Sequence, residues 1–273
     1  MAIIKKAILY VALFIVGDGY ASHFPVSYGS QASALAQQGV CLTNIWAARN
    51  NPAALSLLKK TTASLFFQNK YCIPELSLQS IAVGIPTKYG TIALTGSFFG
   101  QELYKESFIG LSYGKRLSQK FSMGLQLDYF AIKTSQDEFN KCNAVSFDIG
   151  ILYRLSDKLC IGSHIYNPLN VKISDKSNDR IPSAITIGTM FTIDENLLLF
   201  TQIQKITNRR EDYSIAIEYK MKDIFFIRGG VTTAPEVLSF GFGVIINKLS
   251  FNISSSMHQT LGFSPQATLS YSF

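Results

Sequence analysis

Charged side chains are scarce in this sequence. Asp, Glu, Lys and Arg make up 16% of its 273 residues, whereas an ordinary soluble protein contains about 25%. Disordered chains combine high charge with low hydrophobicity, and 47% of this chain is hydrophobic, so disorder is excluded. The 25 Lys and Arg residues outnumber the 18 Asp and Glu residues but form no basic stripe. Nucleic acid is therefore not an expected partner.

Long hydrophobic runs are missing after Ala21. The apolar run at residues 7–16 follows Lys5 and Lys6 and precedes the small residues around Ala21. This order is typical of a secretory signal peptide, and the run is too short for a membrane-spanning helix, which needs about 20 residues. We therefore predict that residues 1–21 direct export and are removed. An exported chain without a second hydrophobic helix is periplasmic, secreted or an outer-membrane barrel.

Motifs of enzymes and metal sites are also missing. The sequence has no Gly-x-Ser-x-Gly element and only three histidines. The spacings of Cys41, Cys72, Cys142 and Cys160 match neither a metal site nor a dense disulfide framework. One disulfide is compatible with an oxidising compartment, although isolated buried thiols are favoured. His164 shares a strand face with Cys160 but lies about 13 Å away at that spacing, too far for one metal ion. We expect no cofactor and no enzymatic activity.

What the sequence does contain is alternation of apolar and small polar residues from about residue 61 to its end. Side chains of a strand point to opposite faces in turn, so alternation predicts strands with one apolar face. Most segments are about ten residues long, as a tilted transmembrane strand requires, whereas soluble strands average about 5–6 residues. The fourteen predicted strands lie near 61–69, 76–85, 90–98, 104–115, 119–132, 142–153, 158–166, 182–193, 196–205, 211–220, 223–231, 236–245, 248–257 and 263–273.

Two features favour a transmembrane barrel over a soluble sandwich. Tight turns such as 155–158 alternate with longer connections at 133–141, 167–181 and 206–210, an arrangement typical of outer-membrane barrels. The less apolar face carries mostly Ser, Gly, Ala and Thr, which is too uncharged for a surface in water. The predicted fold is an all-β transmembrane antiparallel barrel of about 14 strands over residues 61–273.

Charged residues on the less apolar face are expected to line the lumen and to pair across it. Asp128 and Asp148 lie on neighbouring strands, where two carboxylates can perform acid–base chemistry. The favoured interpretation is that they pair with Arg49 or another lumen cation. The full set of predicted polar lumen residues is Asp128, Asp148, Arg154, His164, Glu218 and Arg228.

Residues 22–60 break the alternation. Residues 31–38 are rich in alanine and helical in character, and Pro52 suits the first position of a helix. A barrel of about fourteen strands encloses more space than its own side chains fill. We therefore expect residues 22–60 to form a small helical hatch in the lumen. The alternative is a periplasmic tail outside the barrel.

The same segment carries a family resemblance. Gly29-Ser30-Gln31-Ala32, Ala36-x-x-Gly39-Val40 and the run from Trp46 to Leu55 resemble the hatch of FadL-type outer-membrane proteins, and most closely that of the PorV/PorQ-like branch typical of Bacteroidota. Arg49 precedes Asn51-Pro52-Ala53, which matches the Asn-Pro-Ala motif of that family. The resemblance implies a plugged fourteen-stranded barrel in the outer membrane of a Gram-negative bacterium, with membrane lipid as its surroundings.

The C-terminus adds a second resemblance. The chain ends in an alternating segment that contains Tyr271 and terminates at Phe273. Such an ending resembles the signal by which the bacterial barrel-insertion machinery recognises its substrates. That machinery is therefore an expected partner.

Two functions remain open at this point. The favoured one is an accessory or scaffold subunit of an outer-membrane protein machine, such as type IX secretion or a related assembly complex, because short loops and a small-residue lumen offer no evident substrate site. The alternative is a FadL-type channel for small hydrophobic molecules such as fatty acids. A change of alternation phase near Ser80 predicts a β-bulge and favours this alternative. The long extracellular loops of either branch are absent.

Overall fold

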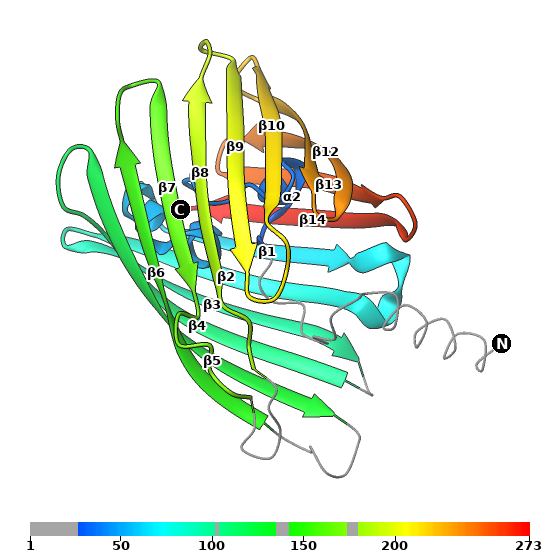
Figure 1. Ribbon diagram of the computed structural model, residues 1–273. Helices are drawn as coiled ribbons and strands as arrows, with labels where there is room; N and C mark the ends of the chain where they lie inside the picture. The colour runs from blue at the N-terminus through cyan, green and yellow to red at the C-terminus, as the bar shows by residue number, and fades with distance from the viewer. Residues whose placement is uncertain (1–26, 102–103, 135–141, 174–179) are drawn as a thin grey trace.

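The computed structural model describes residues 27–273 apart from 102–103, 135–141 and 174–179. The predicted signal peptide and most of the predicted connection 133–141 lie outside these described residues. Fourteen antiparallel strands form one closed barrel (Figure 1), which confirms the predicted antiparallel barrel of about 14 strands. The strands are β1 (Thr62–Asn69), β2 (Ser77–Thr87), β3 (Gly90–Gln101), β4 (Tyr104–Arg116), β5 (Phe121–Thr134), β6 (Cys142–Arg154), β7 (Leu159–Tyr166), β8 (Ala184–Thr192), β9 (Leu197–Ile206), β10 (Asp212–Met221), β11 (Phe225–Thr233), β12 (Glu236–Ile246), β13 (Leu249–His258) and β14 (Gly262–Ser272).

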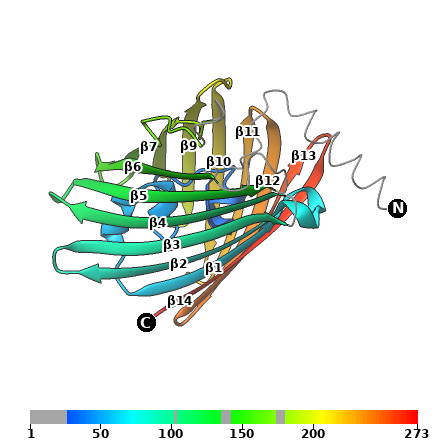
Figure 2. The same ribbon diagram turned by 90° about the horizontal axis from the view of Figure 1, so that it is seen from below.

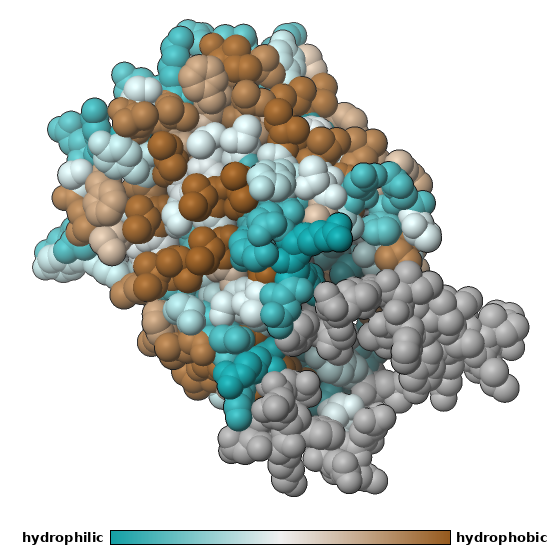
Figure 3. Space-filling model, in the orientation of Figure 1, coloured by the Kyte–Doolittle hydropathy of each residue, from teal (hydrophilic) through white to brown (hydrophobic). Residues whose placement is uncertain are grey.

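The two faces of the strands differ as the alternation predicts. In β5, Leu125 and Leu127 are 54% and 61% exposed, whereas Gln126 between them is fully buried. Apolar side chains spread over the outside of the strands, and hydrophilic ones gather toward their ends (Figure 3). An outer wall of this kind matches the hydrocarbon of a bilayer. Among the described residues, no helix is long and apolar enough to cross a membrane.

Strand β2 runs without interruption along both of its neighbours. Its pairing with β1 keeps one register from Thr62 and Gly84 to Asn69 and Ser77, and its pairing with β3 is equally regular. The bulge predicted near Ser80 is therefore wrong. Leu78 is 1% exposed and points inward. The sequence pattern misled because an apolar residue here occupies the inner face of the strand.

The two ends of the barrel are distinct. The start of β1 pairs with the end of β14, Thr62 with Ser272, and the connections at this end are short, such as residues 155–158. We call it the turn end. The opposite loop end carries the 3-10 helices η2 (Lys70–Cys72) and η3 (Pro74–Leu76) and the connection between β7 and β8.

Residues 27–58 lie inside the ring of strands, and we call them the inner segment (Figures 1 and 2). The segment contains helix α2 (Ser30–Ala34), helix α3 (Ala47–Asn50) and the 3-10 helix η1 (Pro52–Leu57). Helix α2 contacts β12 and β13, and η1 contacts β4, β5 and β6. Every residue of α3 is buried. The inner segment therefore fills the space between opposite sides of the wall.

Candidate functional site between the inner segment and the wall

A glycine niche in the wall receives the start of η1. Gly114, Gly124 and Gly150 lie side by side on β4, β5 and β6, because Gly124 is the register partner of both other glycines. A Cβ atom on Gly124 would overlap the backbone of Pro52. Side chains are thus excluded here by the close approach of the inner segment, which explains three inward-facing glycines at one level of the barrel.

Asn51 fixes the inner segment in this niche. Its Nδ2 amide donates to the carbonyl oxygens of Val40 at 2.8 Å and Ile151 at 3.0 Å. Its Oδ1 accepts from the backbone N–H of Ala53 at 3.1 Å, which caps η1. The side chain thereby joins two parts of the inner segment to strand β6. Within the Asn-Pro-Ala tripeptide, Asn51 makes the polar contacts and Pro52 and Ala53 fill the niche.

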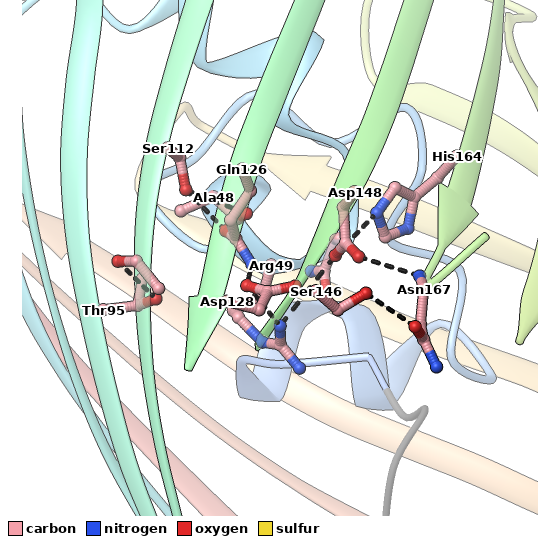
Figure 4. Close-up of polar contacts among 12 residues, drawn as sticks. Ala48, Arg49, Thr95, Ser112, Gln126, Asp128, Ser146, Asp148, His164 and Asn167 are labelled. Carbon is pink, nitrogen blue, oxygen red and sulfur yellow. Dashed lines mark hydrogen bonds and ion pairs between the residues drawn. The ribbon is translucent and has the colours of Figure 1, made fainter. Parts of the chain in front are cut away.

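Arg49 brings together three of the predicted lumen residues (Figure 4). Its Nη1 atom is 3.8 Å from Oδ1 of Asp128 on β5 and 4.0 Å from Oδ2 of Asp148 on β6. His164 on β7 places Nε2 3.3 Å from the same oxygen of Asp148. The side chains of Arg49 and the two aspartates are at most 2% exposed. We call these four residues the ion-pair cluster.

Neighbouring hydrogen-bond donors hold both carboxylates in place. Gln126 donates to Asp128 at 2.6 Å, and the backbone N–H of Asn167 donates to Asp148 at 3.0 Å. The carboxylates therefore face a guanidinium and hydrogen-bond donors, as the ion-pair interpretation requires. Among the described residues, no group of three or more His, Cys, Asp or Glu side chains is placed to hold a metal ion.

Aromatic rings enclose the guanidinium of Arg49. Its Cζ atom lies 3.7 Å from the ring centre of Phe108, 4.8 Å from that of Tyr28 and 5.6 Å from that of Tyr166. Cation–π attraction is strongest where water is excluded, and Arg49 is 4% exposed. The cluster thus couples the inner segment to strands β4 to β7 through both charge and aromatic contact.

Replacing Arg49 tests this coupling. Arg49→Met leaves Asp128 and Asp148 buried without their cation, and breaking a buried ion pair from one side costs about 3–5 kcal/mol. We expect the urea midpoint of the detergent-solubilised barrel to fall by a corresponding amount. Lys205→Gln is the control, because Lys205 and Glu211 form an ion pair that is about half exposed and such pairs contribute little. Equal midpoints for Arg49→Met and wild type would show that the cluster does not hold the barrel together.

The other predicted site residues lie apart from this cluster. Glu218 and Arg228 are register partners on β10 and β11 and form a buried ion pair. Glu218 also accepts a hydrogen bond from Gln31 of α2 at 3.0 Å, so this pair too reaches the inner segment. Tyr271 and Phe273 lie outside the barrel at the turn end with ring centres 4.9 Å apart.

The predicted lumen position of Arg154 is wrong. Arg154 has the inward phase of β6, but it is the last residue of that strand and is exposed. Inward phase predicts a lumen position only within the length of the strand that the barrel encloses. At the turn end the same phase places a side chain in solvent.

An apolar cluster at the loop end was not predicted. Its members share the inward phase of their strands near the ends that face the loops; they include Phe66, Leu78, Phe99, Phe108, Phe130 and Tyr166. We call it the loop-end cluster. The signal was present in the sequence: along β5 the inward residues change from Ser122 and Gly124 to Phe130. A prediction limited to polar lumen residues does not include these aromatic positions.

A small pocket lies between the inner segment and the wall. A pocket beside the ion-pair cluster is lined by residues of the inner segment and of β7 to β9, including Ser27, Arg49, His164 and Gln202. Its volume of about 20 Å³ suffices for about one water molecule. A larger molecule therefore fits in this pocket only if the inner segment or the wall moves.

Comparisons with known proteins add solved structures of the same fold. No protein-family model and no curated protein matches the chain. The CymD monoaromatic hydrocarbon channel matches with a TM-score of 0.67 at 11% identity, over 92% of this chain and 99% of that one. A FadL homologue of Pseudomonas aeruginosa matches with a TM-score of 0.66 at 14% identity, over 91% and 99%. The toluene transporter TbuX of Ralstonia pickettii matches with a TM-score of 0.67 at 12% identity, over 90% and 97%.

These structures overturn the function that the sequence favoured. One is described as a hydrocarbon channel, one as a toluene transporter and one as a FadL homologue, and none of the three is described as a subunit of a secretion machine. The accessory role in type IX secretion is therefore wrong. The alternative, a FadL-type channel for small hydrophobic molecules, agrees better with these structures. Channels and transporters are not enzymes, in agreement with the expected lack of enzymatic activity. This chain has the fold of the FadL-type outer-membrane channels.

Proposed function

We propose that this protein is an outer-membrane channel for small hydrophobic molecules. The observation that carries the proposal is the shared fold: more than 90% of this chain and 99% of the CymD hydrocarbon channel superpose. The apolar outer wall supports a position in a membrane, and we place the barrel in the outer membrane of a Gram-negative bacterium. The PorV/PorQ-like branch and the origin in Bacteroidota stay predictions from the inner-segment motifs.

The loop-end cluster supports an apolar ligand. Phe66, Phe99 and Phe130 present rings inward at the loop end, where a molecule from outside the cell would arrive. Ligand sites are lined mainly by apolar and aromatic side chains. A compact hydrocarbon gains contact with these rings, whereas a sugar or an ion would lose hydration without hydrogen-bonding partners.

In this proposal the inner segment acts as the hatch. The ion-pair cluster stands between the loop-end cluster and the turn end, where η1 occupies the glycine niche. The pocket beside Arg49 holds about one water molecule, so a hydrocarbon that takes this path displaces the hatch. The channel is thus selective and normally closed, unlike an open water-filled porin.

The test measures uptake of toluene and of a sugar in parallel. Cells that carry the protein should take up radiolabelled toluene faster than cells with an empty vector, at low concentrations where diffusion through the membrane is slow. Swelling of liposomes in arabinose should be the same with and without the protein. Equal toluene uptake in both cell lines would refute the proposal, and rapid swelling in arabinose would identify an open porin instead.

A single substitution at the loop end sharpens this test. Phe99→Ser removes an inward ring that is 7% exposed, and loss of an aromatic contact of this size weakens binding by about 1–3 kcal/mol. We expect toluene uptake at low concentration to fall about tenfold. Phe98→Ser removes the same side chain from the outer face, where Phe98 is 61% exposed, and should leave uptake unchanged. Equal uptake by the two variants would exclude the loop-end cluster as the entry site.

A further inference from the structure

Two of the four cysteines meet across the boundary between the inner segment and the wall. Cys41 belongs to the inner segment and is 3% exposed, and Cys160 points inward from β7 and is 7% exposed. Sγ of Cys41 lies 3.9 Å from the backbone carbonyl oxygen of Cys160. The other two cysteines, Cys72 and Cys142, are exposed and half-buried. Cys41 and Cys160 are therefore the two buried cysteines, and they belong to separate parts of the fold.

The wall is shaped to admit Cys41. Gly162 on β7 and Gly188 on β8 are register partners, and a Cβ atom on Gly162 would lie 2.7 Å from the carbonyl oxygen of Val40 and 3.1 Å from Sγ of Cys41. The Cys41 thiol donates to the carbonyl oxygens of Gly188 at 3.5 Å and Cys160 at 3.9 Å. These glycines let the backbone of the inner segment approach β7 closely enough for the Cys41 thiol to reach the backbone of Cys160.

Both cysteines are free thiols and buried in this structure. Because Cys41 Sγ already reaches the backbone of Cys160, rotation about the side-chain bonds is the movement needed to bring the two sulfur atoms to the S–S bond length of about 2.05 Å. Disulfides persist in oxidising compartments such as the bacterial periplasm, through which an exported chain passes before it folds. The remaining two thiols would then stay reduced.

We propose that Cys41 and Cys160 form a disulfide that fastens the inner segment to strand β7. The reaction is thiol–disulfide exchange with a disulfide-bearing oxidant of the periplasm. One cysteine thiolate attacks the oxidant to give a mixed disulfide, and the other thiolate then displaces the oxidant's second sulfur. The two cysteines lose two electrons and two protons, and the oxidant leaves as two thiols. The proposal rests on export of the chain and does not depend on which molecule the channel carries.

The fastening acts at one side of the inner segment. Strand β7 holds both Cys160 and His164, so the disulfide and the ion-pair cluster attach to the same strand. The contacts of α2 with β12 and β13 lie elsewhere and remain non-covalent. The oxidised protein therefore keeps its inner segment joined to β7 even when the ion pairs of Arg49 are broken.

Peptide mapping tests the bond directly. The protein is taken from its outer membrane with iodoacetamide present, unfolded without a reductant, alkylated again and cut with trypsin. Each cysteine then lies in a separate peptide: one that ends at Arg49, and those of residues 71–88, 142–154 and 159–172. We expect the first and last to appear as one cross-linked species, with Cys72 and Cys142 alkylated. Alkylation of all four cysteines, or any other linkage, would overturn the proposal.

Variants and hydrogen exchange test the fastening. Cys160→Ser should make Cys41 available to alkylation after unfolding, whereas Cys142→Ser should leave the cross-linked species intact. Reduction of the wild type should speed amide exchange in the inner segment about tenfold, and reduction of Cys160→Ser should cause no further change. An inner segment that exchanges equally fast before and after reduction would show that the bond does not fasten it.

Discussion

Deleting residues 22–58 should raise the single-channel conductance of this barrel in a planar bilayer at least about tenfold, because fourteen strands enclose more space than their own side chains fill. In the intact protein that space is occupied by α2, α3 and η1, whose residues are mostly buried. Currents recorded at fixed voltage in concentrated KCl give the measurement. A deletion variant that folds and conducts no better than wild type would show that the inner segment is not the plug.

Gly124→Val provides the same test without shortening the chain. A side chain on Gly124 would occupy the position of the Pro52 backbone, so η1 cannot remain in the glycine niche. We expect intermittent open currents in this variant. Gly229→Val is the matched control, because the nearest atom to an added Cβ is the Ser239 carbonyl oxygen at 3.7 Å. Opening in both variants would mean that any added valine disturbs the barrel.

Leu127→Arg should sharply reduce insertion of the protein into lipid vesicles. Leu127 lies in the middle of β5 and is 61% exposed on the outer face. Arginine facing the midplane of a bilayer costs roughly 2–4 kcal/mol, a large share of the stability of a typical domain. The folded fraction is measured by the shift that folded barrels show on unheated gels. We expect mainly unfolded protein at lipid concentrations where wild type folds completely.

Leu169→Arg is the control for this substitution. Leu169 is 62% exposed but lies in the connection between β7 and β8, at the end of the barrel rather than along its wall. The same chemical change should leave insertion unaffected there. Normal insertion of Leu127→Arg would contradict the assignment of the outer wall to lipid.

The barrel was predictable from the sequence because alternation is local. Residues such as Gln126 and Leu127 carry opposite hydrophobicity, and a strand must place them on opposite faces. The positions of Asp128 and Asp148 on neighbouring strands follow from the same rule. Their common partner Arg49 was only one of the cations considered, because its place depends on how the inner segment folds within the lumen.

The errors about individual strand residues arose near the ends of strands. Leu78 is apolar although it faces inward, and Arg154 has inward phase although it lies in solvent. Alternation specifies a face but does not specify depth along the barrel axis. The loop-end cluster is not predicted for the same reason. Phe99 and Phe130 face inward, but alternation does not show that both lie near the loop end of the barrel. The contact between Cys41 and Cys160 spans 119 residues, and no local pattern encodes it.

The way the inner segment touches the wall has a consequence for the order of assembly. Ser30 is hydrogen-bonded through its backbone N–H to Thr268 on β14 at 2.8 Å, whereas η1 sits on β4 to β6. The inner segment, which precedes all fourteen strands in the sequence, therefore has docking partners in the middle of the chain and near its end. Contacts between residues so distant in sequence form slowly. The inner segment must therefore lie within the curved sheet before β14 pairs with β1. If the barrel closed earlier, the inner segment would remain outside the lumen.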